Sequence, residues 1–337
     1  MNFFIDPYIF AFDKDTFTKE QLEEFINNLI DWKKLIDLNW GRVYKPTDTF
    51  DILFKYKLYP LVDGLKELVN KYNIDYIQPE EIDKIVNSVL NKLPTIEDYS
   101  GINDILIDTD NLNIQSNRND DFIHILKKLV TILKMDCIIN KKRDNGQILL
   151  SKELDSPLIK FDALISIIDA NHNIDLPIAL NIEFNHFANF KEFCTKIEPA
   201  IIWINAQNDL CIRMAVYIKV FQHDETMDYI NKANTPNFIL YDSFFKSMRD
   251  LNFHTDEAKI DNLLRALFEE ILHLNMKDTH ELRVSKSGGA KQIEYNKYTG
   301  WRRDIDYEYH LHYWKRGENL IFTDVVSHNN YDITKFN

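Results

Sequence analysis

The chain has 337 residues, 45% of them hydrophobic, with only 8 glycines and 9 prolines, which excludes a collagen-like, low-complexity or loop-dominated protein and predicts two or three domains. Its formal net charge of −13 excludes a protein that coats nucleic acid through a broad cationic surface, although a local basic site stays open. Three cysteines, none of them in a CxxC pair, exclude a disulfide scaffold and a cysteine-type zinc site.

The sequence predicts a cytoplasmic protein with no membrane partner. No run approaches the roughly 18 apolar residues that a membrane span needs. The N-terminus lacks the basic flank and apolar stretch of a signal peptide. The cysteines are expected to be buried thiols in a reducing compartment.

The first segment, residues 1–98, is predicted to be a helical domain behind a strand over residues 3–12. Thr18 and Gln21 form a capping box, in which each side chain can satisfy the backbone N–H of the other. Another helix is expected to begin at Pro79, because proline at the first helical position loses no hydrogen bond.

The second segment, residues 99–275, is predicted to be a mixed α/β domain. An amphipathic pattern over residues 122–135 indicates a helix. Two short apolar runs, 177–184 and 200–204, suit buried strands. Further helices are expected over residues 209–221 and 256–274.

The third segment, residues 276–337, is predicted to form a small twisted antiparallel sheet with a helix that contains 280–283. Alternation puts Tyr307, Tyr309, Leu311 and Tyr313 on one strand face, where core packing is expected, and His310 and His312 on the other. A five-residue connection, 315–319, should lead into a strand over 320–326.

The order Gly300-Trp-Arg-Arg, Tyr-His-Leu-His-Tyr, hairpin, Leu-Ile-Phe and His328…Tyr331 resembles the second half of RelE/ParE-superfamily toxins. The similarity is greatest to the RelE- and YoeB-type endoribonucleases and covers about residues 270–335. The resemblance implies an α+β fold with a RelE-like C-terminal domain. It also implies RNA cleavage without a metal or other cofactor, in which a base takes the 2′-hydroxyl proton, cations stabilise the phosphorane and an acid protonates the leaving oxygen.

Carried over by position, the resemblance implies a catalytic set and a nucleic-acid-binding set. The catalytic set is Arg303, His310, His312, His328 and Tyr331. The nucleic-acid-binding set is Lys286, Lys291 and Arg302. His310 stands where the family commonly has a phosphate-stabilising arginine, so a permanent charge and a bidentate donor are missing there.

Several alternatives stay open. His310 and His312 share a strand face and could bind a metal with His328, but no acidic or cysteine ligand is evident beside them in the sequence. Asp162 and Glu183 loosely resemble the acids of a PD-(D/E)xK nuclease, whose catalytic lysine is absent. Solvated charge is the competing interpretation for the lysines.

The sequence therefore predicts a regulated endoribonuclease of bacterial toxin–antitoxin or phage-defence type, acting on RNA or ribosome-bound mRNA. The large acidic region before it would control or target the C-terminal domain, with a protein partner or antitoxin as a further expectation. The alternatives are a non-catalytic binding or assembly subunit and a ParE-like topoisomerase inhibitor.

Overall fold

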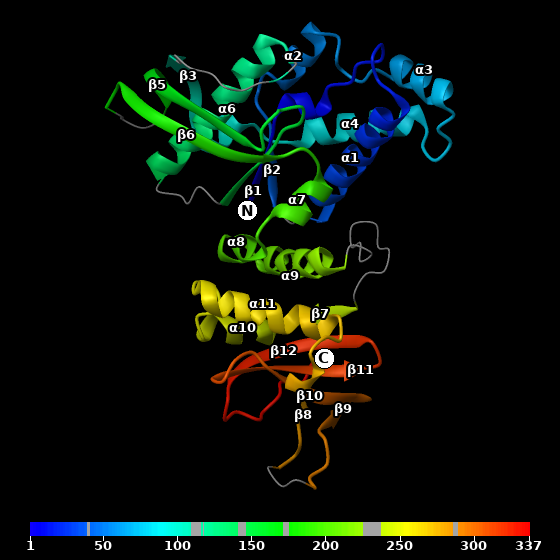
Figure 1. Cartoon of the computed structure of the whole chain (residues 1–337), viewed down its shortest axis with the longest axis vertical. Coiled ribbons are helices and arrows are strands. Elements are labelled where there is room, and N and C mark those ends of the chain that lie inside the picture. Colours follow the sequence, from blue (N-terminus) through cyan, green and yellow to red (C-terminus); the bar gives the residue numbers. More distant parts are fainter. Residues whose placement is uncertain are drawn as a thin grey trace. The chain divides into compact units, whose positions relative to one another are not determined.

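The computed structural model describes residues 1–38, 41–108, 116, 118–140, 146–170, 175–224, 237–285 and 289–337. Over these residues the chain forms helices and two mixed six-stranded sheets, which confirms the α+β class (Figure 1). It divides into two compact units, residues 1–193 (unit 1) and 194–337 (unit 2).

Unit 1 is built on a sheet with the strand order β2-β1-β4-β6-β5-β3, parallel from β2 to β6 and antiparallel from β6 to β3. Its strands are β1 (Asn2–Ile5), β2 (Arg42–Tyr44), β3 (Ile102–Asp108), β4 (Gln147–Leu150), β5 (Leu158–Ala170) and β6 (Ile178–Phe187). Its helices are η1 (Pro7–Phe10), α1 (Lys19–Leu38), α2 (Thr49–Lys55), α3 (Val62–Tyr72), α4 (Pro79–Lys92), α5 (Ile96–Ser100) and α6 (Asp120–Asn140). Helix α7 (Phe190–Lys196) runs across the boundary between the units.

Two helices of unit 1, α1 and α4, begin at the positions that the sequence predicts, directly after a capping residue. The Thr18 backbone N–H donates to Oε1 of Gln21 over 2.9 Å, and the Gln21 N–H donates to Oγ1 of Thr18 over 3.3 Å. Helix α4 begins at Pro79, and the Gln78 N–H donates to Glu81. These bonds satisfy N–H groups that the first helical turn would leave without partners, so they fix both starting points.

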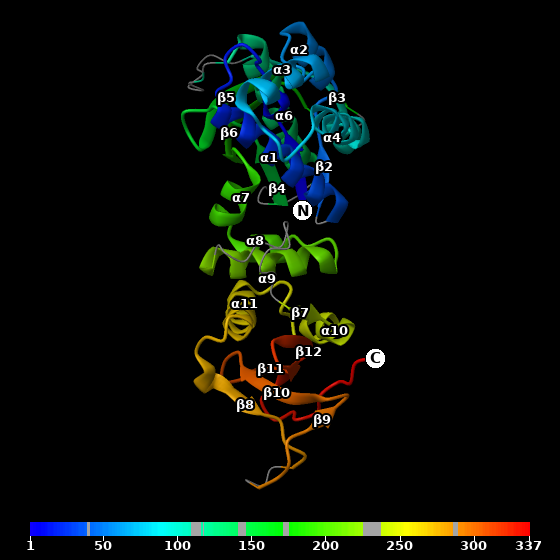
Figure 2. The ribbon, with the colours of Figure 1, turned by 90° about the vertical axis from the view of Figure 1, so that its right-hand side faces the viewer.

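Unit 2 is built on the second sheet, with the strand order β7-β12-β11-β10-β8 and β9 paired to β10. Its strands are β7 (Phe238–Leu240), β8 (Thr279–Glu281), β9 (Glu294–Tyr295), β10 (Tyr298–Asp304), β11 (Tyr309–Arg316) and β12 (Asn319–Ser327). Its helices are α8 (Pro199–Ile204), α9 (Asp209–His223), α10 (Asp242–Asp250), α11 (Glu257–Ile271) and η3 (Met276–Asp278). Figures 1 and 2 both show α10 and α11 on one side of this sheet.

The chain divides between residues 193 and 194, whereas the sequence predicted boundaries near residues 98 and 275. Each unit is built around one of the two sheets. One buried cluster of unit 1 joins Phe4 and Ile96 to Leu129 and Ile159, so no boundary separates the first segment from the next. In unit 2, β12 pairs with β7, and α11 carries carboxylates that bind Arg303. A C-terminal domain that began at residue 276 would lack both strand β7 and the carboxylates of α11.

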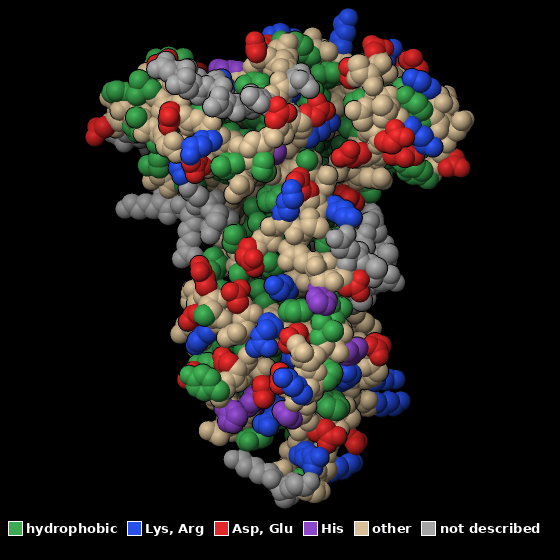
Figure 3. Space-filling view, in the orientation of Figure 1, with side chains coloured by type: hydrophobic (Ala, Val, Ile, Leu, Met, Phe, Trp, Pro, Cys, Tyr) green, Lys and Arg blue, Asp and Glu red, His purple; other side chains and the backbone are tan. Residues whose placement is uncertain are grey.

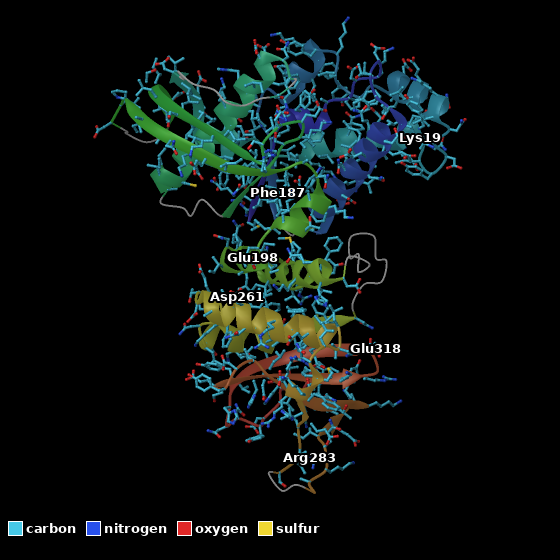
Figure 4. The ribbon with its side chains drawn as sticks, in the orientation of Figure 1. Lys19, Phe187, Glu198, Asp261, Arg283 and Glu318 are labelled. Carbon is cyan, nitrogen blue, oxygen red and sulfur yellow. The ribbon has the colours of Figure 1, made fainter. Side chains whose placement is uncertain are left out.

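Three expected elements of unit 2 are wrong. The run 200–204 is helix α8, because Pro199 occupies a helix start and a short apolar run fits either structure. Residues 279–281 form strand β8, which pairs with β10, where a helix was expected. The β11–β12 hairpin turns on only Gly317 and Glu318, and Gly317 adopts the left-handed φ of 58° that the tight turn needs (Figure 4).

Two expected strands of unit 1 differ in extent or burial. The first strand ends at Ile5, because the Pro7 ring starts the short helix η1. Strand β6 alternates between exposed and buried side chains along most of its length, so it is only half buried. Among the described residues, no helix combines the length and apolar character needed to cross a bilayer.

Candidate functional site

Adjacent residues of β10 point to opposite faces of the unit 2 sheet, because side chains alternate along a strand. The antiparallel register places Arg302 directly opposite His280 of β8 and His312 of β11. His312 is in turn opposite Asp324 of β12. Directly paired residues lie close enough to interact, so four strands contribute one continuous polar row.

A second pair lies two residues along the same face, where Asp304 is opposite His310. We call this surface the histidine face, and its members are His280, Arg302, Asp304, His310, His312 and Asp324. Figure 3 shows exposed histidine side chains beside basic and acidic ones on unit 2. The sequence placed His310 and His312 on one working face, and the strand register agrees with that placement.

His310 lies among three other ionisable side chains. Its Nδ1 is 2.9 Å from Oδ1 of Asp304, although the two atoms lack hydrogen-bond alignment. The His328 ring centroid is 4.6 Å from that of His310, and Nε2 of His280 is 3.7 Å from Oδ2 of Asp304. Burial lowers the pKa of the His310 imidazole, and the negative charge of Asp304 opposes that shift.

His312 is buried and held in one tautomer. Its Nδ1 lies 2.9 Å from the backbone carbonyl oxygen of Asp332, and since a carbonyl only accepts, Nδ1 carries the proton. Burial lowers the pKa of His312 to about 4, so the ring is neutral at pH 7. Nε2 then carries a lone pair, and this atom has no hydrogen-bond partner in the described chain. A neutral imidazole with a fixed lone pair can act as a general base.

Arg302 supplies the positive charge of the face. Its guanidinium carbon lies 5.3 Å from the centre of the Tyr331 ring, a cation–π distance, and its Nη1 atom is buried without a hydrogen-bond partner. An arginine keeps its charge at any physiological pH. Arg302 can therefore stabilise an anion next to His312.

Buried polar atoms without partners gather on this face. Of the fifteen such side-chain atoms among the described residues, five belong to Arg302, Asp304, His310 and His312. An unmade hydrogen bond in a buried position costs about 1–3 kcal/mol per atom, so evolution seldom leaves several together without a function. These atoms are shielded from solvent as well as unpaired, so a polar ligand can bind them only when the face opens.

The opposite face binds Arg303 in a structural network. The guanidinium is fully buried, with Nη2 2.6 Å from Oε2 of Glu269 and Nη1 3.2 Å from Oε2 of Glu270. Nη1 also donates to the carbonyl oxygen of Leu274 over 3.2 Å. Arg303 is thus placed away from the histidine face, and Arg302 is the arginine that lies on that face.

The remaining predicted residues fall into three groups. His328 is exposed and Tyr331 is half-buried, and both lie against the histidine face. Lys291 is exposed, and its ammonium lies 3.4 Å from Glu294, so it behaves as a solvated loop charge. Lys286 lies outside the described residues.

The sequence reasoning missed Asp304, His280 and Asp324. Asp304 could have been found from parity, because it lies two residues after Arg302 on the same strand and therefore on the same face. His280 was assigned to a helix, and Asp324 was treated as an ordinary strand residue. Both become part of the site only through cross-strand pairing, which residue spacing along the chain does not reveal.

The acids weighed for a nuclease of unit 1 belong to cross-strand pairs. Asn181 donates to Asp162 over 2.8 Å, and Lys160 forms an ion pair with Glu183. These pairs join β5 to β6 on an exposed face. Within the described ranges, no group of three or more His, Cys, Asp or Glu side chains is arranged to hold a metal ion.

Comparison with known proteins found no matching family model, no matching curated protein and no matching solved structure.

Proposed function

We propose that unit 2 is a metal-independent endoribonuclease and that the histidine face performs acid–base chemistry on an RNA phosphate. The observation that carries the proposal is the direct pairing of a charged Arg302 with a neutral His312 whose Nε2 lone pair is unpartnered. The resemblance of residues 270–335 to RelE- and YoeB-type toxins supports the same chemistry.

In the proposed reaction, Nε2 of His312 takes the proton of a ribose 2′-hydroxyl. The 2′ oxygen forms a bond to phosphorus while the bond from phosphorus to the 5′ oxygen breaks. His310, in its imidazolium form next to Asp304, gives a proton to the departing 5′ oxygen, and Arg302 stabilises the charge on the phosphorane. The products are a 2′,3′-cyclic phosphate and a 5′-hydroxyl. General acid–base steps of this kind contribute roughly 10²–10⁴-fold in rate.

RNA cleavage by the full chain tests the proposal, with naked RNA and with translating ribosomes as substrates. His312→Gln and Arg302→Gln should each lower the cleavage rate by about 100-fold or more, because one removes the base and the other the fixed charge. His273→Gln and Arg316→Gln are matched controls, since both side chains are exposed on the same unit and lie outside the histidine face. Cleavage should persist in EDTA.

Unchanged cleavage in both His312→Gln and Arg302→Gln would sink the assignment of the site. Folding of each variant is checked by circular dichroism, so that loss of structure is not counted as loss of chemistry. Products with 2′,3′-cyclic phosphate ends would support the proposed step, whereas 3′-hydroxyl ends would contradict it.

A second candidate function is a non-catalytic binding or assembly subunit. The observation in its favour is that His310 and His312 are both 0% exposed, so a substrate reaches neither ring while the surface is closed. Intact RNA under all conditions would favour this function. Intact RNA together with DNA-damage signalling on overexpression would favour a ParE-like inhibitor of topoisomerase.

We further propose that unit 1 controls or targets this activity. The support is that unit 1 carries most of the excess of acidic residues, with 32 Asp and Glu against 22 Lys and Arg. An acidic surface repels nucleic acid and suits a protein partner.

A further inference from the structure

The last residues of the chain lie against the histidine face. Residues 328–337 follow β12 and contain no helix or strand. We call them the C-terminal strap. Figures 1 and 2 both show much of this red segment on the side of the sheet away from α10 and α11. At its end, the N–H of Asn337 donates to the hydroxyl of Tyr241, next to the start of α10, over 3.3 Å.

The strap is attached by its backbone at two alternate positions. The carbonyl oxygen of Asp332 accepts from Nδ1 of His312 over 2.9 Å, and the carbonyl oxygen of Thr334 accepts from Nε1 of Trp314 over 2.7 Å. His312 and Trp314 are two residues apart on β11, so an extended segment matches their spacing. An extended chain is therefore bound along the strand by its main chain.

Side chains add two anchors. The backbone N–H and the hydroxyl of Thr334 both donate to the carboxylate of Asp324, over 2.8 and 2.6 Å. The ring of Phe336 lies 5.0 Å from Tyr298, 5.5 Å from Tyr295 and 6.0 Å from Trp314, measured between centroids. These contacts bury aromatic surface and use charge-assisted hydrogen bonds, which together stabilise the closed position.

The closed strap covers the groups that the proposed chemistry needs. His328 packs on His310, Tyr331 lies over the Arg302 guanidinium, and Asp332 occupies Nδ1 of His312. His310 and His312 are 0% exposed, although Nε2 of both rings has no hydrogen-bond partner in the described chain. A substrate phosphate can reach these atoms only after the strap moves.

We propose that the C-terminal strap is an autoinhibitory cover of the histidine face and that its release opens the site to RNA. The effect of release on RNA cleavage rests on the proposed function, whereas the position of the strap over the histidine face does not. The attachment uses a few hydrogen bonds and the side chains of His328, Tyr331 and Phe336, and none of these contacts is a strand pairing, so the strap can open without unfolding the sheet. Such weakly attached segments supply the low-stability elements of regulated proteins.

The experiment measures histidine accessibility and RNA cleavage in the same full-length variants. The released variant is Thr334→Ala with Phe336→Ala, which removes the hydroxyl bond to Asp324 and the aromatic anchor, keeps the Thr334 N–H bond, and leaves the histidine face intact. Asn329→Ala is the control, because it alters an exposed strap residue outside both anchors. Diethyl pyrocarbonate reacts with accessible imidazole nitrogens, and mass spectrometry reads its rate at each histidine.

In the unaltered chain, His310 and His312 should react much more slowly than the exposed His273. In the released variant, their rates should rise about tenfold, the change expected when one charge-assisted hydrogen bond is lost, while His273 stays unchanged. RNA cleavage should rise by a similar factor in the released variant and stay at the basal rate in Asn329→Ala.

The two readouts separate the two proposals. Unchanged reactivity of His310 and His312 in the released variant would overturn the strap, whatever the RNA shows. Raised reactivity without RNA cleavage in any variant would support the cover and overturn the endoribonuclease. Raised reactivity with lowered cleavage would overturn autoinhibition, because the strap would then assist the reaction.

Discussion

Arg302 and Arg303 are neighbours in the sequence but lie on opposite faces of the same sheet. Arg302 is opposite His312 on the histidine face, whereas Arg303 is fully buried between Glu269 and Glu270 of α11. Strand alternation alone produces this separation. One arginine is therefore available to a ligand, while the other joins the sheet to its helix.

Arg303→Ala is predicted to destabilise unit 2 by about 3–5 kcal/mol, because it leaves two buried carboxylates without their cation. Arg302→Ala, which loses a cation–π contact, should cost about 1 kcal/mol or less. Hydrogen exchange of the β10 and β11 amides measures both effects within unit 2. Equal protection in the two variants would contradict the structural assignment of Arg303.

The lowered pKa of His312 predicts that unit 2 loses stability in acid. The unfolded chain binds a proton near the ordinary value of 6.5, while the folded chain binds it only near 4. Between these values the unfolded state holds more protons, so the free energy of unfolding falls as pH falls from about 6.5 to about 4. The full loss is about 3 kcal/mol for a shift of this size.

His312→Gln should flatten that pH dependence, since glutamine does not titrate. Urea denaturation at pH 7 and at pH 4.5 measures it, with unit 2 followed by hydrogen exchange because two units need not unfold together. His273→Gln is the control, because His273 is exposed. An equally steep fall in His312→Gln would assign the pH dependence to other groups.

The sequence predicted which β11 residues lie on the histidine face, but it could not show on which face of β10 each arginine lies. The alternation correctly separates His310 and His312 from Tyr313, whose pKa is raised by burial on the other face. It is wrong for Tyr307, which precedes the start of β11 and is 85% exposed. Local patterns also predicted the capping box at Thr18. A resemblance carried over by position, however, chose Arg303 over Arg302, because motif order says nothing about which face a residue occupies.

Other features depend on pairing between distant segments. The membership of His280 follows from β8 pairing with β10, and the two-residue hairpin follows from the register of β11 and β12. The run 200–204 was ambiguous for a different reason. Short apolar segments fit a buried strand and a buried helix equally well, and only the surrounding packing decides.

Asp304 and Arg302 are predicted to shift the pKa of His310 in opposite directions. Burial has the largest effect and lowers that pKa; the carboxylate of Asp304 raises it, and the guanidinium of Arg302 lowers it further. Asp304→Asn should therefore lower the pKa of His310 further, and Arg302→Gln should raise it. Titration of the His310 ring by NMR measures both, and shifts of the same sign would contradict this electrostatic arrangement.

In unit 1, Asp6 and Ser151 follow the adjacent parallel strands β1 and β4, and Arg118 joins them. Both charged side chains are 0% exposed, with Nη1 of Arg118 2.5 Å from Oδ2 of Asp6 and Nη2 2.9 Å from Oγ of Ser151. Arg118→Ala should destabilise unit 1 by about 3–5 kcal/mol, because Asp6 would stay buried without a cation.

Lys55→Ala is the matched control for Arg118→Ala. Lys55 forms an exposed ion pair with Asp121 in the same unit, and exposed pairs contribute about 0–1 kcal/mol. Hydrogen exchange of the β1 and β4 amides compares the two variants. If Arg118→Ala costs no more than Lys55→Ala, the buried pair does not stabilise this end of the sheet. If Arg118→Ala is destabilising because Asp6 has lost its cation, adding Asp6→Asn should recover part of the stability, since a neutral amide removes the unpaired charge.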